Sequence, residues 1–201
     1  MNENIEIKHA KLNIWLPVLL YCALASLVNS VITYFPFIPA SLSTWISRAI
    51  MMAVILCMFQ LALVNDRYKK AGIFRAIMLG CNLITSYLFG SMILTLVASI
   101  VSIIAVYQEY SAHSEVIADH DAKLSKAWHS LFNWSILAAV LLSLGASIVA
   151  VILVLADMEG GASRISTIAI GLLSVPQFVI EIMYILYIKK MLVIISEGEV
   201  E

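Results

Sequence analysis

Four long apolar stretches constrain this chain more than any other feature of its sequence. They cover residues 12–34, 46–64, 131–155 and 165–188. A helix needs about 20 apolar residues to cross about 30 Å of hydrocarbon, and each stretch is near that length. Charged residues make up 12% of the chain, whereas a soluble domain carries about 25%. The sequence therefore predicts an all-α integral membrane protein in contact with the lipid bilayer, with residues 1–201 forming one helical domain.

A fifth apolar region, residues 73–110, contains no strongly polar loop and is too long for one span. As a single helix it would be roughly 57 Å long at 1.5 Å per residue, which is more than tilting can absorb. Two short spans, 73–89 and 91–108, with a turn at Phe89-Gly90-Ser91, fit better. We therefore expect six transmembrane helices, arranged as three antiparallel hairpins.

The basic residues are distributed unequally about these six spans. Segments 1–11, 65–75, 109–130 and 189–201 would lie on one side of the membrane. Together they carry Lys8, Lys11, Arg67, Lys69, Lys70, Arg75, Lys123, Lys126, Lys189 and Lys190. Only Arg48 and Arg164 would lie on the other side. Because cytoplasmic loops are enriched in Lys and Arg, we expect both termini in the cytoplasm and the protein in the plasma membrane.

The last span carries one polar face. Ser174, Gln177, Glu181 and Tyr184 follow one another at steps of three or four residues, which places them on one side of a helix. Glu181 would lie roughly 12 Å inside the end marked by Lys189. A carboxylate at that depth must face protein, water or an opposite charge. The sequence predicts a binding locus for a cation or a small polar ligand, and the alternative is an ion pair between two helices.

Pro176 adds to the same region, because it cannot donate a hydrogen bond to the carbonyl of Leu172. Such a carbonyl needs a neighbour or water to satisfy it. A free carbonyl and a carboxylate within about two turns strengthen the case for a ligand at this locus. The alternative is an ordinary proline kink.

Arg75 is the candidate counter-charge to Glu181. It begins the third span and shares a helix face with Asn82, which continues to Ser86. We therefore expect the face of Arg75, Asn82 and Ser86 to meet the polar face of the last span across a buried cavity, in the cytoplasmic half. The alternative is that Arg75 extends its guanidinium to lipid phosphates. Asn29 and Gln60, the amides of the first two spans, are expected to form hydrogen bonds between helices.

Residues 109–130 form the most polar part of the chain. His113, His120 and His129 are weak candidates for a metal site, because their spacing matches no zinc motif. A solvated loop followed by a capped helix explains them more simply, with Asp119 or Asp121 as the cap. Apolar residues then recur at helical spacing and predict an amphipathic cytoplasmic segment over about 119–130. This segment is also a candidate docking surface for a membrane or cytoplasmic protein partner.

Several classes of function find no support in the sequence. The net charge of −1 and the lack of a basic patch exclude nucleic acid as a partner. No glycine-rich phosphate loop, nucleophile elbow or pair of catalytic carboxylates is present, so we expect no enzyme and no cofactor. The leading hypothesis is a small-molecule or ion transporter, or a substrate-binding transporter subunit, with a polar cavity near Glu181. The competing hypothesis is a membrane regulator, immunity factor or assembly factor that acts by binding another protein.

The length and the six-span layout are similar to those of the substrate-binding subunits of energy-coupling-factor vitamin transporters. The similarity covers length and number of spans only. It implies a transport role and assigns no residue a function.

Overall fold

A computed structural model describes residues 2–33, 39–87, 92–155 and 162–197, and all regular structure in these ranges is helical. The helices are α1 (Asn2–Ile32), α2 (Ala40–Leu61), α3 (Asp66–Tyr87), α4 (Met92–Ile117), α5 (Ala122–Leu155) and α6 (Ala162–Glu197). Four of them contain segments long and apolar enough to cross a membrane: Ile7–Ile32, Ala40–Leu61, Met92–Ile117 and Ala122–Val149. The chain is therefore an all-helical protein whose apolar helices suit a membrane.

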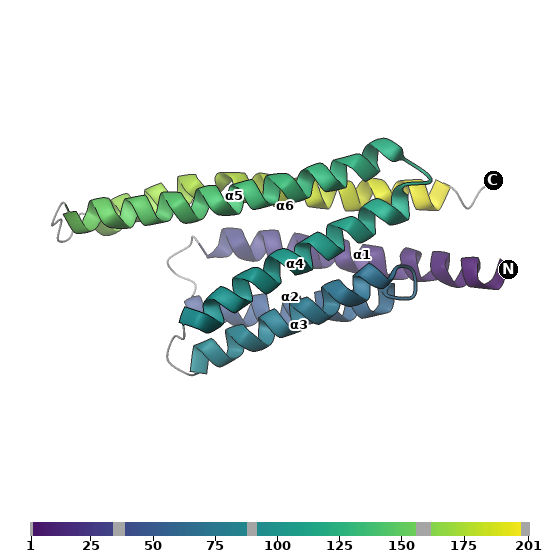
Figure 1. Ribbon diagram of the computed structural model, residues 1–201, viewed down its shortest axis with the longest axis horizontal. Helices are drawn as coiled ribbons and strands as arrows, with labels where there is room; N and C mark the ends of the chain where they lie inside the picture. The colour runs from purple at the N-terminus through teal and green to yellow at the C-terminus, as the bar shows by residue number, and fades with distance from the viewer. Residues whose placement is uncertain (1, 34–38, 88–91, 156–161, 198–201) are drawn as a thin grey trace.

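The six helices pack in a closed ring. Each helix contacts the next one along the chain, and α6 returns to contact α1. Figure 1 shows successive helices running in opposite directions, with the start of α1 and the end of α6 at the same end of the bundle. We call this the terminal end; it also holds the short connections between α2 and α3 and between α4 and α5. The other end is called the opposite end.

The tightly packed core lies toward the terminal end. Met58 of α2, Tyr68 of α3, Ile117 of α4, Trp128 of α5 and Ile188 of α6 are all fully buried there. By contrast, large apolar side chains on the outer faces of the helices are exposed, as lipid contact requires. Examples are Leu56, Leu96, Leu144, Ile148 and Leu186. The bundle is therefore closed by side chains in its terminal half.

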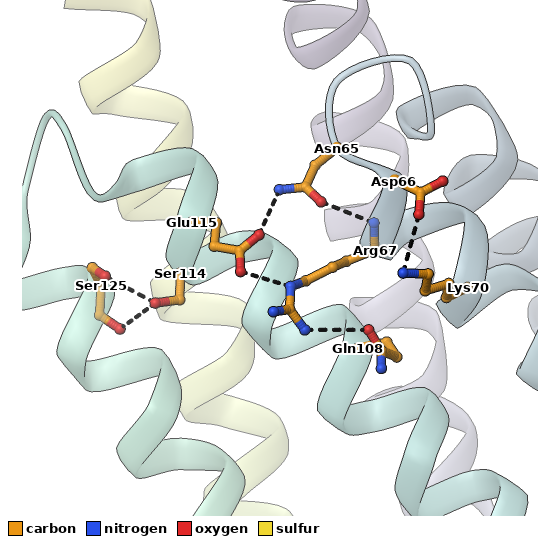
Figure 2. A network of polar contacts seen from close by, with 8 residues as sticks. All are labelled: Asn65, Asp66, Arg67, Lys70, Gln108, Ser114, Glu115 and Ser125. Carbon is orange, nitrogen blue, oxygen red and sulfur yellow. Dashed lines mark hydrogen bonds and ion pairs between the residues drawn. The ribbon is translucent and has the colours of Figure 1, made fainter.

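A polar network joins the α2–α3 connection to the end of α4 (Figure 2). Arg67 donates to Glu115 with an Nε–Oε1 distance of 2.6 Å and to Gln108 with an Nη1–Oε1 distance of 3.4 Å. Asn65 donates to the second carboxylate oxygen of Glu115 at 2.9 Å. Both charged side chains of the Arg67–Glu115 pair are partly exposed. This network fixes the surface of the terminal end, outside the core.

The polar region 109–130 differs from the expected loop and separate amphipathic segment. α4 continues to Ile117 and α5 begins at Ala122, so the connection is short. Residues 109–114 are buried in the bundle. Leu124 and Trp128, in the segment expected to be amphipathic, are core residues in the first turns of α5. The helix continues because one face of this polar stretch packs against its neighbours.

Asp121 precedes α5, caps its first turn and links it to α6. Its Oδ1 accepts hydrogen bonds from the backbone N–H groups of Lys123 and Leu124, both at 2.9 Å. Its Oδ2 accepts one from Lys190 at 2.7 Å. These hydrogen bonds lower the pKa of the Asp121 carboxyl below its ordinary value, and the one from Lys190 has the largest effect. The side chain therefore acts both as a helix cap and as an anchor for the end of α6.

We expect Asp121→Ala to lower the melting temperature in detergent more than Asp121→Asn. Asparagine still caps a helix but has no charge for Lys190, whereas alanine removes both functions. Because the folded-state pKa is depressed, the stabilisation is present above the ordinary pKa of about 3.9 and is lost as the pH falls through the folded-state value. The difference between wild type and Asp121→Asn should therefore shrink on acidification below about pH 4. Equal melting temperatures for the two variants at neutral pH would contradict the capping role.

Candidate functional site

Of the seven polar residues expected to face one another across the third and sixth spans, all but Arg75 and Tyr184 line a single cavity of about 670 Å³. α3 contributes Asn82 and Ser86, and α6 contributes Ser174, Gln177 and Glu181. Helices α1 and α2 line the rest of it with further polar side chains. Among these are Asn29, Thr33, Ser43, Ser47 and Arg48. The cavity is thus formed by four helices, two more than the sequence indicated.

The cavity lies in the half of the bundle away from the terminal end, not in the half of the basic segments where the sequence placed it. Its walls come from the last turns of α1 and α3 and the first turns of α2. Thr33, Thr44 and Ser86 in these turns are exposed, so the cavity communicates with the exterior near the opposite end. Among the α6 residues that line it, Glu181 lies nearest the terminal end. The carboxylate therefore stands at the inner limit of the cavity.

Glu181 is the least compensated charge in this region. The side chain is partly exposed, but its Oε2 is buried and has no hydrogen-bond partner among the described residues. Leaving a buried carboxylate oxygen unpaired is costly in any protein interior. A group from outside the chain, or water, is therefore needed to satisfy it.

Arg75 does not pair with Glu181, as the sequence had suggested, but with Glu109 of α4. Its Nε lies 3.0 Å from Glu109 Oε2, and its Nη2 forms an ion pair with the same oxygen. Tyr184 of α6 donates its hydroxyl proton to the other oxygen, Oε1. The Glu109 side chain is 1% exposed and that of Arg75 is 16% exposed. The alternative in which Arg75 reaches out to lipid phosphates is therefore also wrong.

The triad of Arg75, Glu109 and Tyr184 lies next to the polar cavity. All three line a second, smaller cavity of about 250 Å³ together with Gln177 and Glu181. Gln177 and Glu181 line both cavities, so the two spaces adjoin. The triad therefore forms the floor between the polar cavity and the packed terminal half.

A buried aromatic layer lies beneath the triad. Tyr68 and His113 share a hydrogen bond of 2.7 Å between the Tyr68 hydroxyl and His113 Nδ1. The His113 ring lies against Trp128, with ring centroids 4.5 Å apart. Tyr110 stacks on Tyr184 at 5.6 Å between centroids. Tyr68, His113 and Trp128 are fully buried and fill the interior of the bundle on this side of the triad.

The three histidines considered for a metal site do not converge. His113 is fully buried, whereas His120 and His129 are exposed. Among the described residues, no group of three or more His, Cys, Asp or Glu side chains is placed to hold a metal ion. The structure therefore gives these residues separate environments.

The amides of α1 and α2 form the interhelical hydrogen bonds expected of them. Asn29 and Ser43 form two, with Asn29 Nδ2 donating to the Ser43 carbonyl at 3.3 Å and Ser43 Oγ to Asn29 Oδ1 at 3.2 Å. Lys11 donates to Gln60 at 3.0 Å. Arg48 donates to Ser86 Oγ at 2.8 Å and stacks over the ring of Trp45, 5.0 Å from its centroid. The contacts of Asn29, Ser43 and Arg48 lie where the cavity opens, whereas that of Lys11 with Gln60 lies toward the terminal end.

Comparison with known proteins gives this site no precedent: no family model, no curated protein and no solved structure matches the chain.

Proposed function

We propose that this protein spans the plasma membrane six times and binds a small polar solute in the cavity that ends at Glu181. It transports that solute, alone or as the substrate-binding subunit of a transporter. The observation that carries the proposal is the position of Glu181: a carboxylate with a buried, unpartnered oxygen at the inner limit of a cavity of about 670 Å³. Pockets of 300–1,000 Å³ with a few convergent polar groups are typical of small-molecule sites.

The proposed orientation follows from the charges. The terminal end carries most of the basic residues and corresponds to the cytoplasm under the positive-inside rule. The cavity then opens to the outside, and the triad with its aromatic layer closes the inner side. Ionisable residues buried within a membrane bundle commonly mark substrate pathways. Release to the cytoplasm would require Tyr184 to leave Glu109, which makes the triad the inner gate.

The outward opening can be tested by labelling a single cysteine. In a variant with Cys22, Cys57 and Cys81 replaced by alanine, we expect Gln177→Cys to react with a membrane-impermeant maleimide added from the outside. The same cysteine should not react when the reagent is added from the cytoplasmic side of inverted vesicles. The reason is that Gln177 lines the cavity, whereas the triad lies between it and the terminal end.

Two matched control positions lie on the same helix. Val179 is exposed on the outer face, where lipid would cover it, and Ile188 is fully buried in the terminal half. Cysteine at either position should stay unlabelled, because reaction requires a water-exposed thiolate. If Gln177→Cys reacts from neither side, the bundle is closed. A role in binding another protein would then be favoured, through the exposed residues of the 115–130 stretch.

A further inference from the structure

The cavity carries two opposite charges that lack charged partners. Arg48 is held by Ser86 and Trp45, and no described acidic side chain forms an ion pair with it. Glu181 has its unpartnered Oε2 in the same cavity. The other charged side chains that line the two cavities, Arg75 and Glu109, pair with each other. Arg48 and Glu181 are therefore the charges left available to a ligand.

The two charges lie at different depths. Arg48 is in the first turns of α2, close to the opposite end. Its guanidinium donates to Ser86, in the last turn of α3 at that same end. Glu181 also lines the small cavity together with Arg75, Glu109 and Tyr184, whereas Arg48 lines only the large one. Arg48 thus stands nearer the mouth and Glu181 nearer the floor.

Charges within a membrane bundle are costly unless an opposite charge compensates them. A solute with only an ammonium group would satisfy Glu181 and leave Arg48 unpaired, and a simple anion would do the reverse. A carboxylate suits Arg48 in particular, because a guanidinium can bind it with two parallel hydrogen bonds. Between the two charges, Ser47, Asn82 and Gln177 supply hydroxyl and amide groups for the rest of the solute.

We propose that the solute is a small zwitterion, such as an amino acid or a short peptide. Its carboxylate binds Arg48 near the mouth and its ammonium binds Glu181 at the floor. This inference rests on the proposed function, because it assigns a ligand class to the same cavity. It adds Arg48 to the site as the residue that selects for an anionic end.

The test measures binding to the purified full-length protein by thermal stabilisation in detergent. The probes are the common L-amino acids and dipeptides with free ends. Each one that binds is compared with its amide, which keeps only the ammonium, and with its N-acetyl form, which keeps only the carboxylate. We expect at least one free zwitterion to stabilise the protein, and both blocked forms to bind at least about tenfold more weakly, since each loses one charge-assisted hydrogen-bonded contact.

Substitutions in the protein test where the zwitterion binds. Arg48→Gln and Glu181→Gln should each lower the affinity for the same zwitterion by about tenfold or more. Arg67→Gln and Glu115→Gln, which alter an ion pair at the terminal end, should leave its affinity unchanged. If Glu181→Gln does not fold, the comparison of free and blocked probes on the wild type and on Arg48→Gln decides the question.

The outcomes separate this inference from the proposed function. One outcome is that the amide binds as well as the free zwitterion, that Arg48→Gln leaves the affinity unchanged and that Glu181→Gln abolishes binding. The cavity is then a site for cations, and the assignment of a zwitterionic ligand is wrong. If no zwitterion stabilises the protein but Gln177→Cys is labelled from outside, the ligand class is likewise overturned and the open cavity stands. If no probe stabilises it and Gln177→Cys is not labelled, both proposals fail.

Discussion

Replacing Glu109 by alanine is expected to lower the free energy of unfolding by about 3–5 kcal/mol, because it leaves the guanidinium of Arg75 buried without its counter-charge. The carboxylate binds Arg75 through one oxygen and Tyr184 through the other, and its side chain is 1% exposed. Removing it therefore also leaves the Tyr184 hydroxyl without an acceptor. Denaturant titration or thermal unfolding of the purified protein in detergent measures the effect.

Glu115→Ala is the matched control, since Glu115 lies on the same helix and also pairs with an arginine. The Arg67–Glu115 pair is much more exposed than the Arg75–Glu109 pair, with side-chain exposures of 33% and 45%. Exposed pairs contribute about 0–1 kcal/mol, so this variant should be only slightly less stable than wild type. If Glu109→Ala costs no more than Glu115→Ala, the triad is not the buried ion pair described above. Replacing Arg75 and Glu109 together by methionine should recover much of the loss, because a well-packed apolar pair often substitutes for a buried ion pair.

Trp128→Ala is expected to cost about 3–5 kcal/mol, the range for deleting a large aromatic side chain from a core. Trp128 is fully buried and packs against His113, Tyr110, Tyr184 and Tyr187. The vacated volume lies beneath the triad, where the surrounding rings are held by their own contacts and cannot close it fully. Thermal unfolding in the same detergent measures the loss.

Trp134, two turns further along α5, provides the comparison because it is 60% exposed. Its replacement by alanine should change stability by no more than about 0.5 kcal/mol, as for most surface substitutions. Similar losses for the two tryptophan variants would show that the terminal half is not packed as described. The Trp128→Ala substitution can also be combined with Gln177→Cys. If stability falls strongly and the cysteine now reacts with reagent added from the cytoplasmic side, the aromatic layer seals the cavity.

Hydropathy predicted the helical class of this protein because apolar length directly reflects membrane thickness. It did not predict where helices end, since a helix continues beyond the membrane wherever one face still packs. α4 shows this clearly: the apolar pattern stops near residue 108, yet the helix runs to Ile117. The polar residues 109–114 are buried in the bundle, so polarity in that stretch indicated a site in the interior and not a loop.

Periodicity within a helix predicted the members of the cavity on α3 and α6, because residues three or four apart must share a face. It did not predict the partner of Arg75, which depends on how the helices pack around the ring. One signal was available. A turn at the expected residues 89–91, which lie outside the described part of the chain, would place position 75 opposite about position 105, within about one or two turns of Glu109. An acid at that level on the neighbouring helix was a nearer partner for Arg75 than Glu181.

The contacts of α1 and α2 with the cavity could not be read from either helix alone. Asn29 and Ser43 lie on different helices and face each other only after α1 and α2 pair. Arg48 of α2 donates to Ser86 of the neighbouring α3. Both contacts depend on how adjacent helices pack, which composition and spacing do not describe.

The closure of the ring by α1 and α6 has a consequence for biosynthesis. The contact between these two helices can form only after α6 has been synthesised. Until then the buried face of α1, with Leu12, Leu16 and Leu19, is only partly covered by α2. The polar cavity also lacks its α6 wall, including Glu181, during this period. Truncation before α6 should therefore leave an incomplete bundle that quality-control proteases remove, and the polar cavity is completed only when α6 packs against α1.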